Sequence, residues 1–183
     1  MAASIEAKGY RETTVADVVR LARTSRRTFY EHFEDRAACF IALFEEVNEQ
    51  TMEQVAAAVH PDQPWEAQVD AALDAYLDSV IAQPALYQSF VRELPGLGRA
   101  AADTGLAVIE RFAGLLVALV ETGRREQRGM VTRPLTMDMA VIIVGGLREL
   151  MVISLQRRRD LRELRTGIGA AVKAILRAAV FGE

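Results

Sequence analysis

The sequence predicts an all-α protein with a short, arginine-rich head and a larger apolar helical body. Apolar side chains recur at the i, i+3, i+4 and i+7 spacing of amphipathic helices along most of the 183 residues. Alanine, leucine, valine, glutamate and arginine dominate, and only 5 prolines and 12 glycines interrupt the pattern. No segment alternates apolar and polar side chains as a strand does, so we expect no sheet.

The composition excludes several classes of protein. The single cysteine, Cys39, cannot form a disulfide framework within the chain, and His32 and His60 are too few for a zinc site. No apolar run reaches the roughly 18 residues of a membrane span, and the first ten residues lack the apolar core of a signal peptide. A net charge of −3 argues against a chain that coats nucleic acid over its whole surface. We expect a cytoplasmic, soluble protein without a cofactor or metal.

Helix start and stop signals divide the body. Asp35, Thr136 and either Asp103 or Thr104 are expected N-caps, and Pro64 and Pro84 suit the first turn of a helix. The expected body helices cover residues 35–59, 65–82, 84–94, 106–123, 137–156 and 161–180, with a loop at residues 129–134.

The head has the pattern helix, tight break, short helix. Thr14 and Asp17 resemble a capping box before the first of these helices, and Ser25 is a reasonable N-cap for the second. Phe29 and Phe33 lie one turn apart, so burying both turns the side chains between them outward or sideways. Two such helices can present the second one to the major groove of DNA.

Four arginines give the head a local basic surface in an acidic protein. Arg20, Arg23, Arg26 and Arg27 lie within eight residues that contain no acid. Arginine binds phosphate with a forked geometry and can bond guanine in a bidentate manner. A run of charge is often only a solvated helix face, but the helix break and the buried phenylalanine pair favour a DNA-binding surface.

The motif G-Y-x-x-T-T-V-x-D-V-x-x-x-A-x-x-S-x-x-T-F-Y-x-H-F spans residues 9–33. It closely resembles the N-terminal DNA-binding domain of the TetR family of transcriptional regulators. The resemblance extends to Cys39 and Phe40, and beyond them it is one of helical architecture only. It implies a helix-turn-helix DNA-binding domain over residues 1–36 and a ligand-binding and dimerisation domain over residues 37–183.

The resemblance implies which residues of this sequence contact DNA, position by position. The resemblance implies that Thr13 and Thr14 contact backbone phosphate, and that Arg36 stands where the family usually has a phosphate-binding lysine. The residues that it implies on or beside the recognition helix are Ser25, Arg26, Arg27, Thr28, Tyr30 and His32.

Three departures from the family pattern concern the same region. Arg23 stands where the family commonly has glycine, which would strain a turn that needs positive φ. Glu34 and Asp35 replace the more usual Pro-Ser and add negative charge near the DNA backbone. The first helix is truncated to residues 2–8, so we expect Met1 to be an internal methionine of a longer helix. A truncated helix should expose Val18 and Phe33 and weaken DNA binding.

The body is expected to bind a small molecule and a second copy of the chain. The last two helices are apolar and rich in small residues, which favours a homodimer and hence a palindromic DNA operator. Arg148 and Glu149 interrupt the most apolar helix, so they line a cavity or bond across an interface. The candidate ligand-binding residues are Trp65, Tyr76, Phe90, Phe112, Met139, Arg148 and Glu149, although aromatic residues at this spacing are often simply core.

The sequence therefore favours a homodimeric repressor that a small apolar or amphipathic effector releases from DNA by shifting the fourth helix. The sequence shows no resemblance to a nucleophile–base set, a phosphate loop or a metal motif, so it does not predict an enzyme. The alternative is an all-helical interaction protein whose DNA-binding head has degenerated, which the short first helix and the Glu34-Asp35 pair would favour.

Overall fold

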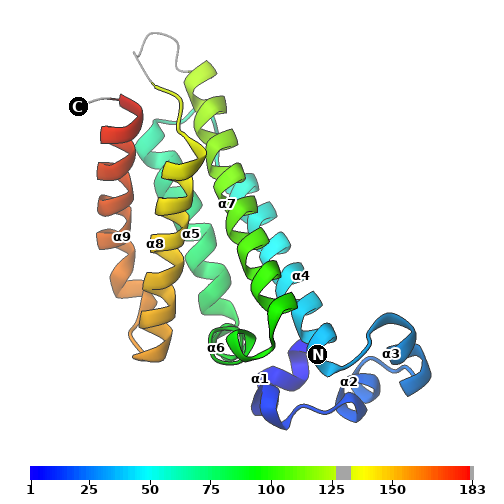
Figure 1. Cartoon of the computed structure of the whole chain (residues 1–183). Helices are drawn as coiled ribbons and strands as arrows, with labels where there is room; N and C mark the ends of the chain where they lie inside the picture. The colour runs from blue at the N-terminus through cyan, green and yellow to red at the C-terminus, as the bar shows by residue number, and fades with distance from the viewer. Residues whose placement is uncertain (127–132, 182–183) are drawn as a thin grey trace. The chain divides into compact units, whose positions relative to one another are not determined.

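The computed structural model describes residues 1–126 and 133–181, and its regular elements there are all helical (Figure 1). The helices are α1 (Ala2–Glu12), α2 (Val15–Leu21), α3 (Arg26–His32), α4 (Arg36–Ala58), α5 (Trp65–Ala82), α6 (Pro84–Glu93), α7 (Arg99–Glu126), α8 (Met137–Gln156) and α9 (Leu161–Leu176). A 3-10 turn, Leu94–Gly96, follows α6, and a π turn, Arg177–Phe181, follows α9. The all-α prediction is confirmed. Within the described ranges, none of the helices is both long enough and apolar enough to cross a membrane.

Side-chain caps fix four helix starts where the sequence predicted them. The hydroxyls of Thr14, Ser25 and Thr136 each accept a backbone N–H from the first turn of α2, α3 and α8. The Asp35 carboxylate accepts the N–H of Ala38 at 2.7 Å and so caps α4. The predicted start of α7 at residues 103–106 is wrong: the helix begins at Arg99, directly after Gly98, whose φ of +82° breaks the preceding turn. Most of the loop predicted at residues 129–134 lies outside the described residues.

Contacts group the chain into two compact units. Unit 1 contains Met1–Glu49 and Ala82–Leu106, and unit 2 contains Gln50–Ile81 and Ala107–Glu183. Helix α6 therefore packs with the N-terminal helices, although its neighbours in sequence belong to unit 2. The functional division at residue 36 stays a prediction, because these units describe packing alone.

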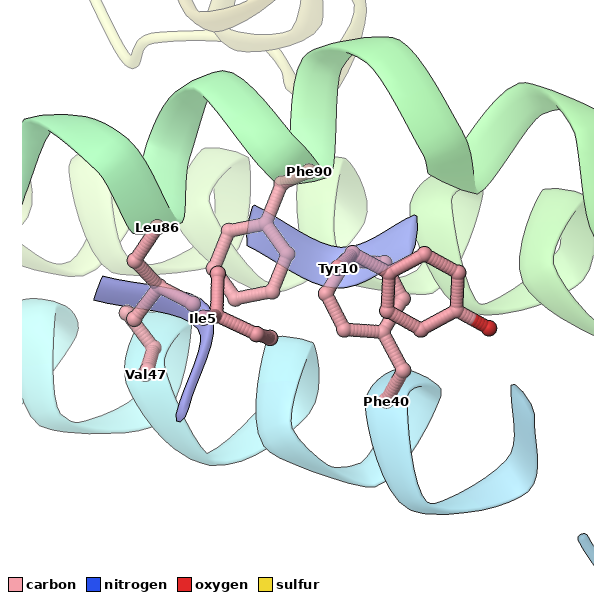
Figure 2. Packing of buried hydrophobic residues seen from close by; sticks show 6 residues of the cluster. All are labelled: Ile5, Tyr10, Phe40, Val47, Leu86 and Phe90. Atoms are coloured by element: carbon pink, nitrogen blue, oxygen red, sulfur yellow. The ribbon is translucent and has the colours of Figure 1, made fainter. Parts of the chain in front are cut away.

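The core of unit 1 holds α1 between α4 and α6. Figure 2 shows Ile5 and Tyr10 of α1 between residues of α4 on one side and of α6 on the other. The Tyr10 ring stacks on Phe40 with centroids 4.1 Å apart, and Phe90 lies 5.2 Å from Phe40. Ile5, Phe40 and Leu86 have no exposed surface. Burying such side chains removes a large apolar area from water, which makes this cluster the main source of stability in the head.

Ion pairs join α5 to α9 in unit 2. Glu66, Asp70, Asp74 and Asp78 recur every fourth residue and therefore line one face of α5. Basic residues of α9 and of the π turn face them: Arg165 bonds both Asp74 and Asp78, Lys173 bonds Asp70 and Arg177 bonds Glu66. Exposed pairs contribute little singly, but a row of them fixes the register of two antiparallel helices.

Two helices end on an arginine in the left-handed conformation. Arg23 follows α2 and Arg158 follows α8, each with φ of +52°. The N–H of Thr24 bonds the carbonyl of Val19 (2.9 Å), and the N–H of Arg159 bonds the carbonyl of Ser154 (2.9 Å). These are Schellman motifs, in which glycine is usual at the left-handed position. The turn therefore has positive φ at Arg23, which is the condition under which the sequence predicted strain at this residue.

Replacing Arg23 by glycine should stabilise the protein, because an L-residue in the left-handed region costs about 1 kcal/mol more than glycine. Equilibrium urea unfolding should show a free energy of unfolding about 1 kcal/mol higher for Arg23→Gly, and likewise for Arg158→Gly. Arg20→Gly is the matched control: Arg20 lies within α2, so glycine there should lower stability by about 1 kcal/mol. Equal destabilisation by all three substitutions would contradict the assigned conformations.

Candidate nucleic-acid interface

Helices α2 and α3 are fixed by a small apolar cluster of their own. Val18 and Val19 of α2 pack with Phe29 of α3 and Cys39 of α4, and all four are buried. Burial raises the pKa of the Cys39 thiol, so this cysteine stays protonated and apolar. Val18 is only 6% exposed because the Met1 side chain packs against the cluster, so the expected exposure of Val18 is wrong.

One side of α3 faces solvent. Tyr30 is 57% exposed, a large value for an aromatic residue, while Phe29 beside it is buried. Arg26, Arg27 and His32 are exposed as well. Arg27 forms an exposed ion pair with Glu31, one turn along α3, at 3.0 Å, which a phosphate or a base could displace at little cost.

The four head arginines are all exposed. Arg20 lies in α2, Arg23 in the turn, and Arg26 and Arg27 in the first turn of α3. Thus α2, the turn and α3 each supply a cation, with no acid between residues 20 and 30. Such a surface is suited to the phosphates on either side of a groove.

Ser25, Thr28 and Thr14 have structural bonds that limit their freedom. The Ser25 hydroxyl accepts the N–H of Thr28 at 3.0 Å and lies 3.0 Å from the Thr28 hydroxyl. Thr14 completes its capping box with Asp17. Ser25 and Thr14 are exposed and Thr28 half-buried. They define where α2 and α3 begin, and the DNA contacts that the resemblance implies for them stay predictions.

Thr13 differs from its expected role. Its side chain has no exposed surface, and its hydroxyl donates to the carbonyl of Gly9 at 2.8 Å and lies 3.0 Å from the Ser4 hydroxyl. A phosphate outside the protein cannot reach this hydroxyl in the structure. Thr13 instead ties the end of α1 together, where Gly9 (φ +79°) kinks the helix.

Arg36 also points inward. One of its terminal nitrogens, Nη1, donates to backbone carbonyls at the end of α1, and its guanidinium lies over the Tyr10 ring. The side chain is half-buried. The arrangement is that of a packing residue rather than of an exposed phosphate contact.

A strong electrostatic contact lies beside the start of α2. The Asp17 carboxylate accepts from Lys8 Nζ at 2.7 Å, from the Thr14 hydroxyl at 2.6 Å and from the Thr14 N–H at 2.9 Å. These hydrogen bonds hold the pKa of Asp17 well below its usual range, and the bond from Lys8 has the largest effect. Asp17 therefore stays charged and ties α1 to α2.

Comparison with known proteins decides the family of this head. Residues 2–43 match the model of the family described as bacterial regulatory proteins, tetR family. The head is a TetR family helix-turn-helix domain. This match supports a DNA-binding transcriptional regulator. No curated protein matches the sequence.

The predicted ligand-binding residues of the body do not form one group. Phe90 belongs to the core of unit 1, whereas the other candidates belong to unit 2, and its ligand-binding role stays a prediction. Arg148 and Glu149 are both exposed on α8, and Glu149 lies on the side of that helix opposite its buried residues. They therefore do not line the interior of unit 2.

The remaining candidates all lie in unit 2. Tyr76 and Phe112 are half-buried and make an edge-to-face contact with centroids 6.1 Å apart. Trp65 and Met139 pack against a second cluster, which contains Ala113, Leu135 and Leu176. A ligand-binding role for these four residues stays a prediction. Within the described ranges, no group of three or more potential metal ligands occurs.

Sequence reasoning missed the residues that attach α1 of the TetR family head to its neighbours. Glu6 and Arg11 of α1 bond α6, and Arg36 bonds the end of α1. These partners are 23 to 82 residues apart in sequence, so no local spacing reveals them. The acidic face of α5 was detectable, since its acids recur every fourth residue.

Removing the ammonium group of Lys8 should raise the pKa of Asp17 toward its ordinary value of about 3.9. NMR titration of the Asp17 carboxyl carbon in the unaltered protein and in Lys8→Met measures this shift. Arg11→Met is the control, because Arg11 bonds Glu93 and not Asp17. An unchanged Asp17 pKa in Lys8→Met would contradict the assigned contact.

The same contact makes stability depend on pH with a definite sign. A depressed pKa in the folded state means that the contribution of Asp17 is complete above pH about 4 and is lost as the pH falls through the folded value. Asp17→Asn should therefore reduce the acid sensitivity of unfolding below pH about 4.

Proposed function

We propose that the protein is a homodimeric repressor of the cytoplasm that a small apolar or amphipathic effector releases from a palindromic DNA operator. The observation that carries this proposal is the exposed face formed by Arg20, Arg23, Arg26, Arg27 and Tyr30 on α2, the turn and α3. Arginine supplies both phosphate binding and guanine recognition, and an exposed tyrosine contacts phosphate or a thymine methyl.

The proposed DNA contacts are a revised set. Arg26, Arg27, Tyr30 and His32 face solvent on α3, and Thr14, Ser25 and Thr28 stand at the starts of the two helices. Thr13 leaves the set because it is fully buried. Arg36 leaves it because its donors bond backbone carbonyls.

An apolar outer face on α8 and α9 supports dimer formation. Ile142 is 62% exposed, and Val141 and Ile175 are exposed as well. A methyl group added at Gly145, Gly146 or Gly167 would have no atom of another described element within 4 Å, so packing against the rest of the described chain does not require glycine there. A second copy that packs closely against this face accounts for both observations.

The effector is proposed to bind among the half-buried aromatic residues of unit 2, with Trp65, Tyr76, Phe112 and Met139 as contacts. An effector acts only through a difference in its affinity for the two states of the protein. Helix α4 is the proposed route to the head, because Arg36–Glu49 packs in unit 1 and the rest of the helix in unit 2. Arg148 and Glu149, exposed on α8, are proposed to bond across the dimer instead of contacting the effector.

One argument for a degenerate head is weaker than the sequence indicated. Asp35 caps α4, so its presence has a structural explanation that does not require loss of DNA binding. The interaction-protein alternative predicts a folded dimer that fails to bind DNA.

DNA binding tests the proposed interface directly. The protein should bind a duplex selected from a random-sequence pool, and Arg27→Ala and Tyr30→Ala should each weaken that binding by about tenfold or more. Fluorescence anisotropy at two salt concentrations measures the effect. The control is Arg99→Ala, an exposed arginine of α7 outside the interface. Binding equal to that of the unaltered protein in both head variants would contradict the proposed interface.

Dimer formation can be tested with two residues of equal exposure. Ile142 on α8 and Leu106 on α7 are each 62% exposed. Ile142→Arg should convert the dimer to monomer in sedimentation-velocity experiments, because it would bury a charge at the interface. Leu106→Arg should leave the dimer intact, and dissociation by Leu106→Arg alone would place the interface elsewhere.

A further inference from the structure

Arg36, the first residue of α4, bonds three backbone carbonyls at once. Its Nη1 atom lies 3.0 Å from the carbonyl oxygen of Tyr10, 3.1 Å from that of Arg11 and 2.7 Å from that of Thr13. The last carbonyls of a helix have no partner within the helix, and here a guanidinium supplies one. The side chain therefore closes the end of α1.

The flat face of the same guanidinium is occupied too. Its central carbon lies 4.3 Å from the centre of the Tyr10 ring, in cation–π contact. Because Nη1 shares its two hydrogens among three carbonyls and the ring covers one face, swinging toward a phosphate would break all of these contacts together.

Arg36 also contacts the residue that precedes the N-cap of α2. The Thr13 carbonyl that it binds most closely directly precedes Thr14, the N-cap of α2. Because α2 and α3 share one apolar cluster, a shift of the backbone between α1 and α2 would move the recognition helix α3 as well.

Helix α1 is attached on its other side to α6. The Glu6 carboxylate accepts the N–H of Leu86 at 3.1 Å, and Arg11 Nε donates to both carboxylate oxygens of Glu93, at 3.0 and 3.2 Å. Arg11 thus bonds α6 with its side chain and Arg36 with its carbonyl. The start of α4, the end of α1 and α6 are joined through consecutive bonds.

We propose that Arg36 is a positioning residue for DNA binding: it fixes the junction of α1 and α2 on the start of α4 and makes no phosphate contact. This inference rests on the proposed DNA-binding function and reverses the role that the family resemblance implies for this position. A phosphate-binding residue and a positioning residue differ in one measurable respect, which is the salt dependence of binding.

The test compares Arg36→Met with Arg26→Met, which removes an exposed arginine of α3. The logarithm of the affinity for a duplex of scrambled sequence is measured against the logarithm of the salt concentration. Loss of one phosphate contact lowers the slope by about 0.9. Arg26→Met should show this decrease, whereas Arg36→Met should weaken binding severalfold with the slope unchanged. A decrease of about 0.9 in Arg36→Met would overturn the proposal.

A second variant, Arg36→Gln, separates a positioning role from a general loss of folding in Arg36→Met. Glutamine has no charge, but its amide can donate to the carbonyls that Arg36 binds. A positioning role predicts that Arg36→Gln recovers part of the affinity lost in Arg36→Met, at an unchanged slope. A phosphate contact predicts no recovery and the smaller slope in both variants, and that outcome would also overturn the proposal.

Tyr10 gives a readout that does not depend on DNA. Burial raises the pKa of Tyr10, and the charge of Arg36 opposes this rise. Arg36→Met should therefore raise the Tyr10 pKa further, as followed by the ring-carbon resonance of labelled tyrosine. An unchanged Tyr10 pKa in Arg36→Met would contradict the contact between Arg36 and Tyr10 and overturn the proposal. If the Tyr10 pKa shifts but the unaltered protein binds no duplex, the DNA-binding function itself is refuted, and the positioning role falls with it.

Discussion

The head depends on one constraint, which is that α1 must stay between α4 and α6. Tyr10 supplies the decisive contacts, since its ring stacks on Phe40 on one face and its backbone carbonyl binds Arg36. Fully burying an aromatic side chain stabilises a fold by several kcal/mol, which is comparable to the whole free energy of unfolding of many small domains. Helix α2 is tied to α1 through the Lys8–Asp17 contact, and α3 packs on α2 and on Cys39 of α4.

Local chemistry was enough to predict much of the fold. The start of α8 agrees with the prediction because its side-chain cap, Thr136, directly precedes it in the sequence. The start of α7 was missed because no side chain caps it at Arg99, and a glycine with positive φ sets it instead. Helix ends with side-chain caps can be read from sequence, whereas ends set by backbone conformation are much harder to find.

The candidate site divides in the same way. The exposed face of α3 follows from helical geometry and the burial of Phe29, so Arg27 and Tyr30 could be assigned without a structure. The inward positions of Thr13 and Arg36 could not, because their partners are backbone atoms of a kinked helix and of a segment more than twenty residues away. The packing of Phe90 was missed for a related reason: its neighbours in sequence belong to unit 2, but it packs in unit 1.

The grouping of α6 with the N-terminal helices has a consequence for protein engineering. A hybrid regulator could be made by joining the DNA-binding segment of this chain to the body of another at a point soon after α3. A junction of that kind here would leave Ile5, Tyr10 and Phe40 without Leu86 and Phe90, and Glu6 and Arg11 without their partners. A functional hybrid would have to transplant Met1–Glu49 together with Ala82–Leu106, two pieces of chain that are folded as one.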